Sequence, residues 1–131
     1  MVNVTFANVI EALMAACPEL IPAFDDYKRW ASEAPPPHVF YGTEFSPRLI
    51  AALNNPSEHA DFLSRAFTLL ESLAGAEDIL VEEVVVFSVV ENLMEDEAVL
   101  EKAKPYMGPN LLRILEEIQE WRRTHRQRQD V

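Results

Sequence analysis

The chain has 131 residues, of which 49% are hydrophobic, and its 22 Asp and Glu against 11 Lys and Arg give a net charge of −11. This length and hydrophobic content suit one globular domain and exclude a disordered chain, and no run approaches the roughly 18–20 apolar residues of a membrane span. The single cysteine, Cys17, excludes an internal disulfide and a cysteine-rich metal site. Because the N-terminus carries Glu11 and no basic leader, we expect no signal peptide and a cytoplasmic protein.

Apolar residues recur at helical spacing in the first quarter of the chain. They predict a helix over residues 4–16 and a second helix over residues 19–32. In the second helix this spacing places Tyr27 and Trp30 on the apolar side.

Three consecutive prolines at residues 35–37 then favour an extended stretch. The apolar segment that follows, residues 38–42, is expected to be a loop or a brief strand. Its Val39 and Phe40 are expected to fill the core, and loop residues 35–44 are the reserve candidate for a binding surface.

Two more helices are predicted between residues 45 and 74. The first covers residues 45–54, with Ser46 as its cap and Pro47 in its first turn. The second covers residues 58–74 and ends at Gly75.

Residues 79–94, ILVEEVVVFSVVENLM, form the most apolar stretch and contain no Gly or Pro. Their β-branched side chains favour a strand locally, but the run is far longer than a typical strand of about 5–6 residues. We therefore predict a helix capped by Asp78. A helix that is apolar on nearly every side must be covered all round, so the other helices are expected to pack about it.

A short helix over residues 96–104 and a final helix over residues 109–122 complete the prediction. The sequence therefore predicts an all-α fold of six or seven helices around a buried central helix. Residues 1–122 form its single domain, and residues 123–131 form a frayed basic tail. A HEAT-like stack of antiparallel hairpins fits this pattern, although no internal repeat is visible.

No catalytic or metal-binding motif is present. The three histidines lie in separate segments, and the three glycines are too dispersed for a phosphate-binding loop. We therefore expect no enzyme, no cofactor and no metal site. Two alternatives remain open: a metal site formed by His38 and Glu44, and an enzyme that uses His38 with Glu44 or a nearby acid.

Carboxylates gather at both ends of the predicted central helix. A negative charge at a helix C-terminus opposes the helix dipole. The group at the C-terminal end is therefore locally unfavourable, which points to a role in binding a partner, although the ordinary alternative is a solvent-exposed face without a function. The first group contains Glu77, Asp78, Glu82 and Glu83, and the second contains Glu91, Glu95, Asp96, Glu97 and Glu101. The candidate partner-binding residues are Glu77, Asp78, Glu82, Glu83, Glu95, Asp96 and Glu97.

Four segments carry a resemblance: PHVFYG (37–42), FLSRAFTLLESL (62–73), VVVFSVVENL (84–93) and KPYMGPNLLRILEE (104–117). They resemble a family of small uncharacterised acidic helical bacterial proteins, similar to the immunity proteins, or antitoxins, of contact-dependent growth inhibition. The resemblance implies an α-helical fold and transfers no catalytic residue.

Charge and resemblance together predict an immunity-type protein that binds and neutralises a basic toxin domain, a nuclease being the favoured class. Residues 1–112 carry six basic and 18 acidic residues, so neither nucleic acid nor an anionic membrane is an expected partner. The alternative is a helical adaptor that binds another protein through an apolar groove, in which case binding would be insensitive to salt.

Overall fold

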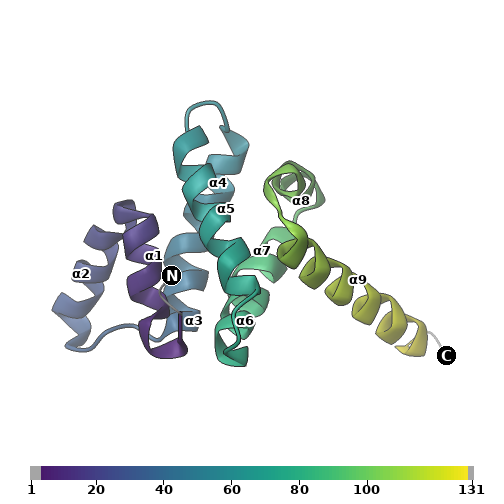
Figure 1. The fold of residues 1–131 in the computed structure, drawn as a ribbon, viewed down its shortest axis with the longest axis horizontal. Helices are drawn as coiled ribbons and strands as arrows, with labels where there is room; N and C mark the ends of the chain where they lie inside the picture. Colours follow the sequence, from purple (N-terminus) through teal and green to yellow (C-terminus); the bar gives the residue numbers. More distant parts are fainter. Residues whose placement is uncertain (1–3, 130–131) are drawn as a thin grey trace.

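The computed structural model describes residues 4–129, and of residues 126–129 it describes the backbone alone. Over this range the chain forms seven helical units and no strand, arranged as one all-α domain (Figure 1). The predicted fold class is confirmed. Within the same range, no single helix is both long enough and apolar enough to cross a membrane.

The first two units are helices entered through 3₁₀ turns. The turn Phe6–Asn8 leads into α1 (Val9–Ala16), and the turn Pro18–Leu20 leads into α2 (Ile21–Ala31). The chain bends by 106° between the two units. Helix α2 ends at Ser32, which adopts the left-handed conformation with φ 65°.

The third unit is one helix made of three segments. Helix α3 (Pro37–Phe40) runs into a π-helical segment, η3 (Tyr41–Phe45), and then into α4 (Ser46–Asn54). The predicted loop or strand over residues 38–42 is therefore wrong, and the helix begins eight residues before the predicted start at residue 45. Of the two side chains expected to fill the core from this segment, Phe40 is buried and Val39 is exposed.

Two prolines explain why this helix was missed. Pro37 occupies the first helical position, where no backbone N–H is required, while Pro36 stays extended (φ −60°, ψ 145°). Pro47 lies inside the helix rather than at its start. A proline normally clashes with the carbonyl four residues earlier, but that carbonyl belongs to Thr43 in the π segment. In the π segment the N–H of Ser46 bonds to the carbonyl of Tyr41, five residues back. The backbone hydrogen bonds in front of Pro47 therefore already depart from the regular pattern of four residues, and the proline fits.

Helix α5 (Ala60–Ala74) and the central helix form the middle of the fold. The central helix joins α6 (Ile79–Val85), a second π segment, η4 (Val86–Val90), and α7 (Glu91–Met94). Its extent, residues 79–94, is as predicted.

Asp78 caps the central helix, as predicted, and has a second role. Its Oδ1 accepts a hydrogen bond from the N–H of Leu80 at 3.0 Å. Its Oδ2 accepts one from the N–H of Phe6 at 2.9 Å. One carboxylate therefore fixes both the start of the central helix and the start of the chain's first helical unit.

The two π segments pack against each other. The Ser46 hydroxyl donates a hydrogen bond to the backbone carbonyl of Ser88, and the side-chain amide of Asn92 donates to the same carbonyl at 2.8 Å. A π segment displaces carbonyls from the regular helical ladder, and these side chains supply replacement donors. Ser46 is therefore a buried bridge inside a helix, and its predicted role as a helix cap is wrong.

The last units are α8 (Glu97–Ala103), a 3₁₀ turn (Lys104–Tyr106) and α9 (Pro109–Gln129). Helix α9 continues through Gln129, past the predicted end at residue 122. Residues 130 and 131 of the expected frayed tail lie outside the described part of the chain.

The first turn of α9 is capped by a residue from α5. The Glu71 carboxylate accepts hydrogen bonds from the N–H groups of Asn110 and Leu111, at 2.7 and 2.9 Å. A carboxylate suits the positive end of a helix dipole. Gly108 permits this approach, because a Cβ there would lie 2.6 Å from the Glu71 Cδ.

The central helix is buried on most sides but not on all. Five of its valines are fully buried, whereas Ile79 is 61% exposed, Leu80 45% and Phe87 55%. The prediction that other helices cover it all round is therefore wrong. One face of the most apolar helix in the chain remains open to solvent.

Candidate functional site

The two groups of carboxylates lie at opposite ends of the central helix. A helix of this length, residues 79–94, spans about 24 Å at 1.5 Å per residue. The groups therefore form two separate acidic surfaces, and one partner must cover the length of the helix to contact both.

In the first group, two of the four carboxylates are engaged within the fold. Asp78 caps the central helix, and Glu82 faces Arg113 of α9 at 3.5 Å. Glu77 and Glu83 make no ion pair with any described side chain.

The second group is explained largely by α8. The Asp96 Oδ1 accepts hydrogen bonds from the N–H groups of Ala98 and Val99, at 2.9 and 3.4 Å, and thereby caps α8. Glu97 lies in the first turn of the same helix. These charges favour the N-terminus of α8, so the inference that they are locally unfavourable is wrong for both residues. Glu95 remains exposed, without an ion pair among the described residues.

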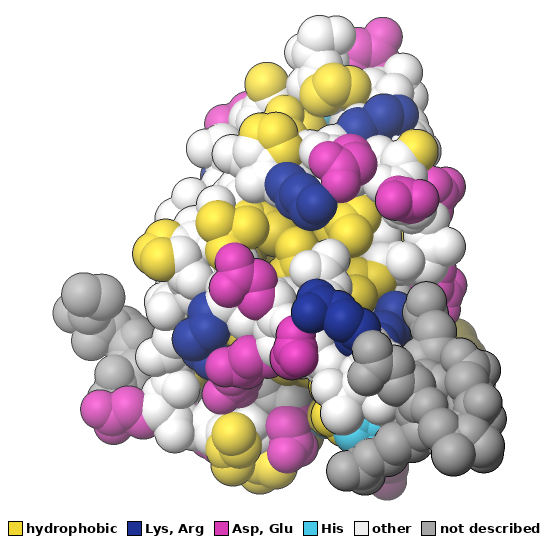
Figure 2. Space-filling view, turned by 90° about the vertical axis from the view of Figure 1, so that its right-hand side faces the viewer, with side chains coloured by type: hydrophobic (Ala, Val, Ile, Leu, Met, Phe, Trp, Pro, Cys, Tyr) yellow, Lys and Arg dark blue, Asp and Glu magenta, His cyan; other side chains and the backbone are white. Residues whose placement is uncertain are grey.

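The face toward which α9 points carries a mixture of charges (Figure 2). Acidic side chains there are interspersed with Lys and Arg, and apolar side chains are exposed between them. On this face the acidic surface is therefore discontinuous.

The alternative pair of His38 and Glu44 is not assembled. The Nδ1 of His38 lies 3.3 Å from the Ser88 Oγ, whereas Glu44 pairs with Arg48 at 2.8 Å. Within the described residues, no three His, Cys, Asp or Glu side chains come close enough together to hold a metal ion.

Cys17 is buried, as expected of a small core residue. Burial, assisted by the nearby Glu19 carboxylate, raises the pKa of its thiol to about 11. The reactive thiolate is therefore scarce at neutral pH.

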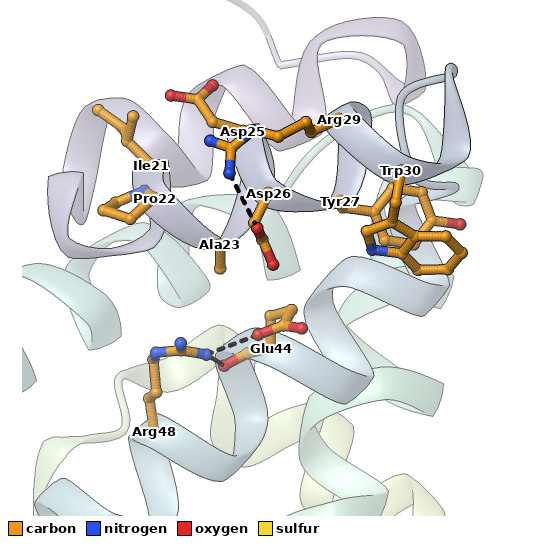
Figure 3. Close-up of a pocket in the computed structure, with 10 residues that line it drawn as sticks. All are labelled: Ile21, Pro22, Ala23, Asp25, Asp26, Tyr27, Arg29, Trp30, Glu44 and Arg48. Atoms are coloured by element: carbon orange, nitrogen blue, oxygen red, sulfur yellow. Dashed lines mark hydrogen bonds and ion pairs between the residues drawn. The ribbon is translucent and has the colours of Figure 1, made fainter.

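A cleft of about 730 Å³ separates α2 from α4 (Figure 3). Tyr27 and Trp30 lie together at one end of the cleft, and Trp30 is 73% exposed, contrary to its predicted place on the apolar side of the helix. The carboxylates of Asp26 and Glu44 are each paired with an arginine of their own helix. The cleft therefore presents no concentrated charge of either sign.

A second opening, of about 400 Å³, lies between the central helix and α9 and is mainly apolar. Its walls carry two exposed aromatic rings, Phe87 (55% exposed) and Trp121 (60% exposed). We call it the α9 groove, and it is lined by Val86, Phe87, Glu91, Glu117, Ile118 and Trp121.

The sequence analysis did not select this groove, although one signal pointed to it. Phe87 lies four residues after Glu83 and four before Glu91, a spacing that places all three on one helix face. One charged residue on each side of an aromatic residue predicts an exposed stripe. This stripe is the open face of the central helix.

No curated protein and no solved structure matches the chain. A family described as a domain of unknown function, DUF7674, matches residues 10–122, and the chain belongs to this family.

Proposed function

We propose that this protein is an immunity-type protein that binds a cationic toxin domain and neutralises it, a nuclease being the toxin class that suits its charge best. The observation that supports this most is the set of free carboxylates at the two ends of the central helix. Glu77, Glu83 and Glu95 make no ion pair with any described side chain. A partner can therefore bind these carboxylates without breaking an ion pair inside the fold.

Electrostatics supplies the mechanism. A protein with a net charge of −11 steers a basic partner toward itself, and opposite surface potentials speed their encounter. A nuclease surface is basic because it holds phosphates. An acidic protein seated on that surface excludes the nucleic acid.

Affinity capture from native cells with charge-reversed variants tests the proposal. The test variant combines Glu77→Lys, Glu83→Lys and Glu95→Lys, and it spares the capping residues Asp78 and Asp96. The control variant combines Glu11→Lys, Glu33→Lys and Glu58→Lys, three exposed acidic residues elsewhere on the chain. Both variants have the same net charge, so any difference between them reports position rather than total charge.

We expect the unmodified chain and the control variant to retain a basic protein at low salt and to release it at high salt. The test variant retains about tenfold less of it. Expressed alone, the captured protein should arrest growth, and co-expression with this chain should restore growth. Equal capture by the two variants, or a captured protein without toxicity, would refute the proposal.

The α9 groove supports a second candidate, a helical adaptor that binds another protein through apolar contacts. Exposed apolar surface of this kind marks interaction sites. The adaptor differs from the immunity protein in its response to salt, because apolar contacts persist at high ionic strength. A partner that stays bound at high salt and is lost with Phe87→Ser would favour the adaptor.

A further inference from the structure

Helix α2 lies on the surface of the domain and is not built into its core. Within the described residues, it is the one α-helix that has no buried side chain. Ala23 and Phe24 are half-buried against the core, whereas Ile21 is 41% exposed and Trp30 73%. Helices in proteins are stabilised mainly by the packing of an apolar face, so α2 gains little stability from its neighbours.

Polar contacts do not replace the missing packing. Among the described residues, no hydrogen bond or ion pair joins a side chain of α2 to another helix. The pair of Arg29 with Asp26, at 3.4 Å, is internal to α2. One aromatic contact does leave the helix, where the ring of Phe24 meets that of Phe40 on α3 edge-on, with centroids 5.7 Å apart. Phe24 is therefore the main contact that holds α2 to the body.

The segments on either side of α2 are, in contrast, fixed. Before the helix, Leu20 is fully buried, and Glu19 accepts hydrogen bonds from Arg65 of α5 at 2.6 and 2.9 Å. After the helix, the chain turns at Ser32 and is buried again at Pro35. In Figure 1, α2 lies at one edge of the molecule, and an irregular stretch leads from it back to α3. A loosely held helix thus lies between two fixed points.

Space for a movement of α2 is already present. The cleft of about 730 Å³ lies between α2 and α4 (Figure 3). The ion pairs on its two walls, Arg29 with Asp26 and Arg48 with Glu44, each lie within one helix. A movement of α2 relative to α4 therefore leaves both of these ion pairs intact while it changes the width of the cleft.

We propose that α2 is a strap that opens away from the body as a unit while the rest of the domain stays folded, and that this opening widens the cleft between α2 and α4. Segments with few buried apolar contacts open at a much smaller free energy than the whole molecule. Opening separates Phe24 from Phe40 and leaves Leu20 and Pro35 in place. The strap is independent of the proposed immunity function, which is based on carboxylates at the central helix.

Native-state hydrogen exchange of the full-length chain at several low urea concentrations tests the proposal. The amides of residues 25–31 should exchange together, much faster than those in the middle of α5. Their exchange should depend little on urea, because a local opening exposes little surface. The α5 amides should depend on urea steeply, since they exchange through global unfolding. Exchange from α2 that is as slow and as steep as exchange from α5 would overturn the proposal.

Two variants of α2 test the role of Phe24. Phe24→Ala removes the contact with Phe40 and should raise the exchange rates of the α2 amides about tenfold, with no change in α5. Trp30→Ala is the matched control, because it also replaces an aromatic residue of α2 by alanine, a better helix former. The Trp30 ring is exposed and contacts Tyr27 of the same helix, so this variant should not raise the rates. Equal rates in the two variants would overturn the assigned role of Phe24.

Proline substitutions separate a strap from an essential part of the fold. Asp26→Pro and Thr68→Pro each place a proline at an exposed site near the middle of a helix, α2 and α5 respectively, and each breaks its helix. In amide NMR spectra, Asp26→Pro should move the α2 signals to random-coil positions and keep those of α5 and the central helix. Thr68→Pro should lose the folded spectrum as a whole. Loss of the whole spectrum with Asp26→Pro would overturn the proposal, because α2 would then be required for the fold.

Discussion

The hydroxyl of Ser46 donates a hydrogen bond to the backbone carbonyl of Ser88, across 42 residues of sequence. This contact joins the two π segments at the point where they pack together. Since both residues are buried, water cannot replace the donor if the hydroxyl is removed.

We expect Ser46→Ala to lower the free energy of unfolding by about 1 kcal/mol, the usual value for one hydrogen bond. The loss stays at this level because the Ser88 carbonyl keeps its hydrogen bond from Asn92. Urea unfolding followed by circular dichroism measures the change. Ser64→Ala, at an exposed site on α5, serves as the control, and an equal loss in both variants would contradict the assigned role of Ser46.

Asp78 provides a second test of stability. Asp78→Ala removes the cap of the central helix and the acceptor for the Phe6 N–H, and should lower the free energy of unfolding by about 1–2 kcal/mol. Glu77→Ala, one residue earlier and exposed, should change it little. Hydrogen exchange at the amide of Phe6 should rise in the first variant alone. An unchanged exchange rate there would show that this amide is held by other contacts.

Cys17 should resist thiol reagents in the native protein. Burial holds the pKa of its thiol at about 11 instead of the ordinary 9.0, and the chain has no other cysteine to confuse the signal. Reaction with Ellman's reagent at neutral pH should be slow and should become fast in denaturant. Rapid labelling of the folded chain would contradict the buried position.

The same shift predicts how stability responds to alkaline pH. The folded chain retains the Cys17 proton at pH values where the unfolded chain has lost it. The contribution of this thiol is therefore fully present below pH 9.0 and is lost as the pH rises toward about 11. Comparing Cys17→Ala with the unmodified chain across this range isolates the effect, because the variant lacks the titrating group.

Arg65 predicts a pH dependence of the opposite sign. Its guanidinium binds Glu19 through two hydrogen bonds, at 2.6 and 2.9 Å, and holds the pKa of Glu19 below its ordinary value of 4.5. The contribution of Glu19 is present above pH 4.5 and is lost as the pH falls through the lowered pKa. Because the pair is partly exposed, the effect should be small.

Arg65→Lys keeps the positive charge but loses the bidentate contact with the Glu19 carboxylate. Its melting temperature should fall below that of the unmodified chain at pH 7, and the difference should shrink in acid once Glu19 is protonated. Arg29→Lys is the control, because Arg29 pairs with Asp26 at an exposed site. A difference for Arg65→Lys that is constant with pH would contradict the role of Glu19.

The central helix was predictable because its signals were local. Its length, the absence of Gly and Pro, and an Asp in front of it are sufficient to place residues 79–94 and their cap. The helix over residues 37–54 was not predictable in this way. Pro47 is tolerated only because a π segment precedes it, and the segment faces a second π segment from distant sequence.

The same contrast between local and distant signals applies to the residues of the candidate binding surfaces. Asp78 and Asp96 are helix caps. The capping pattern predicted this role for Asp78, and the same pattern could have identified Asp96. The spacing of Glu83, Phe87 and Glu91 indicates an exposed stripe on the central helix. The groove beside this stripe depends on where α9 lies relative to the central helix, and composition and periodicity carry no information about that placement.

The paired π segments also constrain how this fold can change. A π segment holds one residue more than a regular turn would need, so deleting one residue from η4 would return this stretch to the regular ladder, in which each N–H bonds to the carbonyl four residues back. The carbonyl that now accepts the Ser46 hydroxyl would be taken up by that ladder, while the π segment η3 would remain. Insertions or deletions in residues 41–45 and 86–90 should therefore be tolerated only as matched pairs, one in each segment.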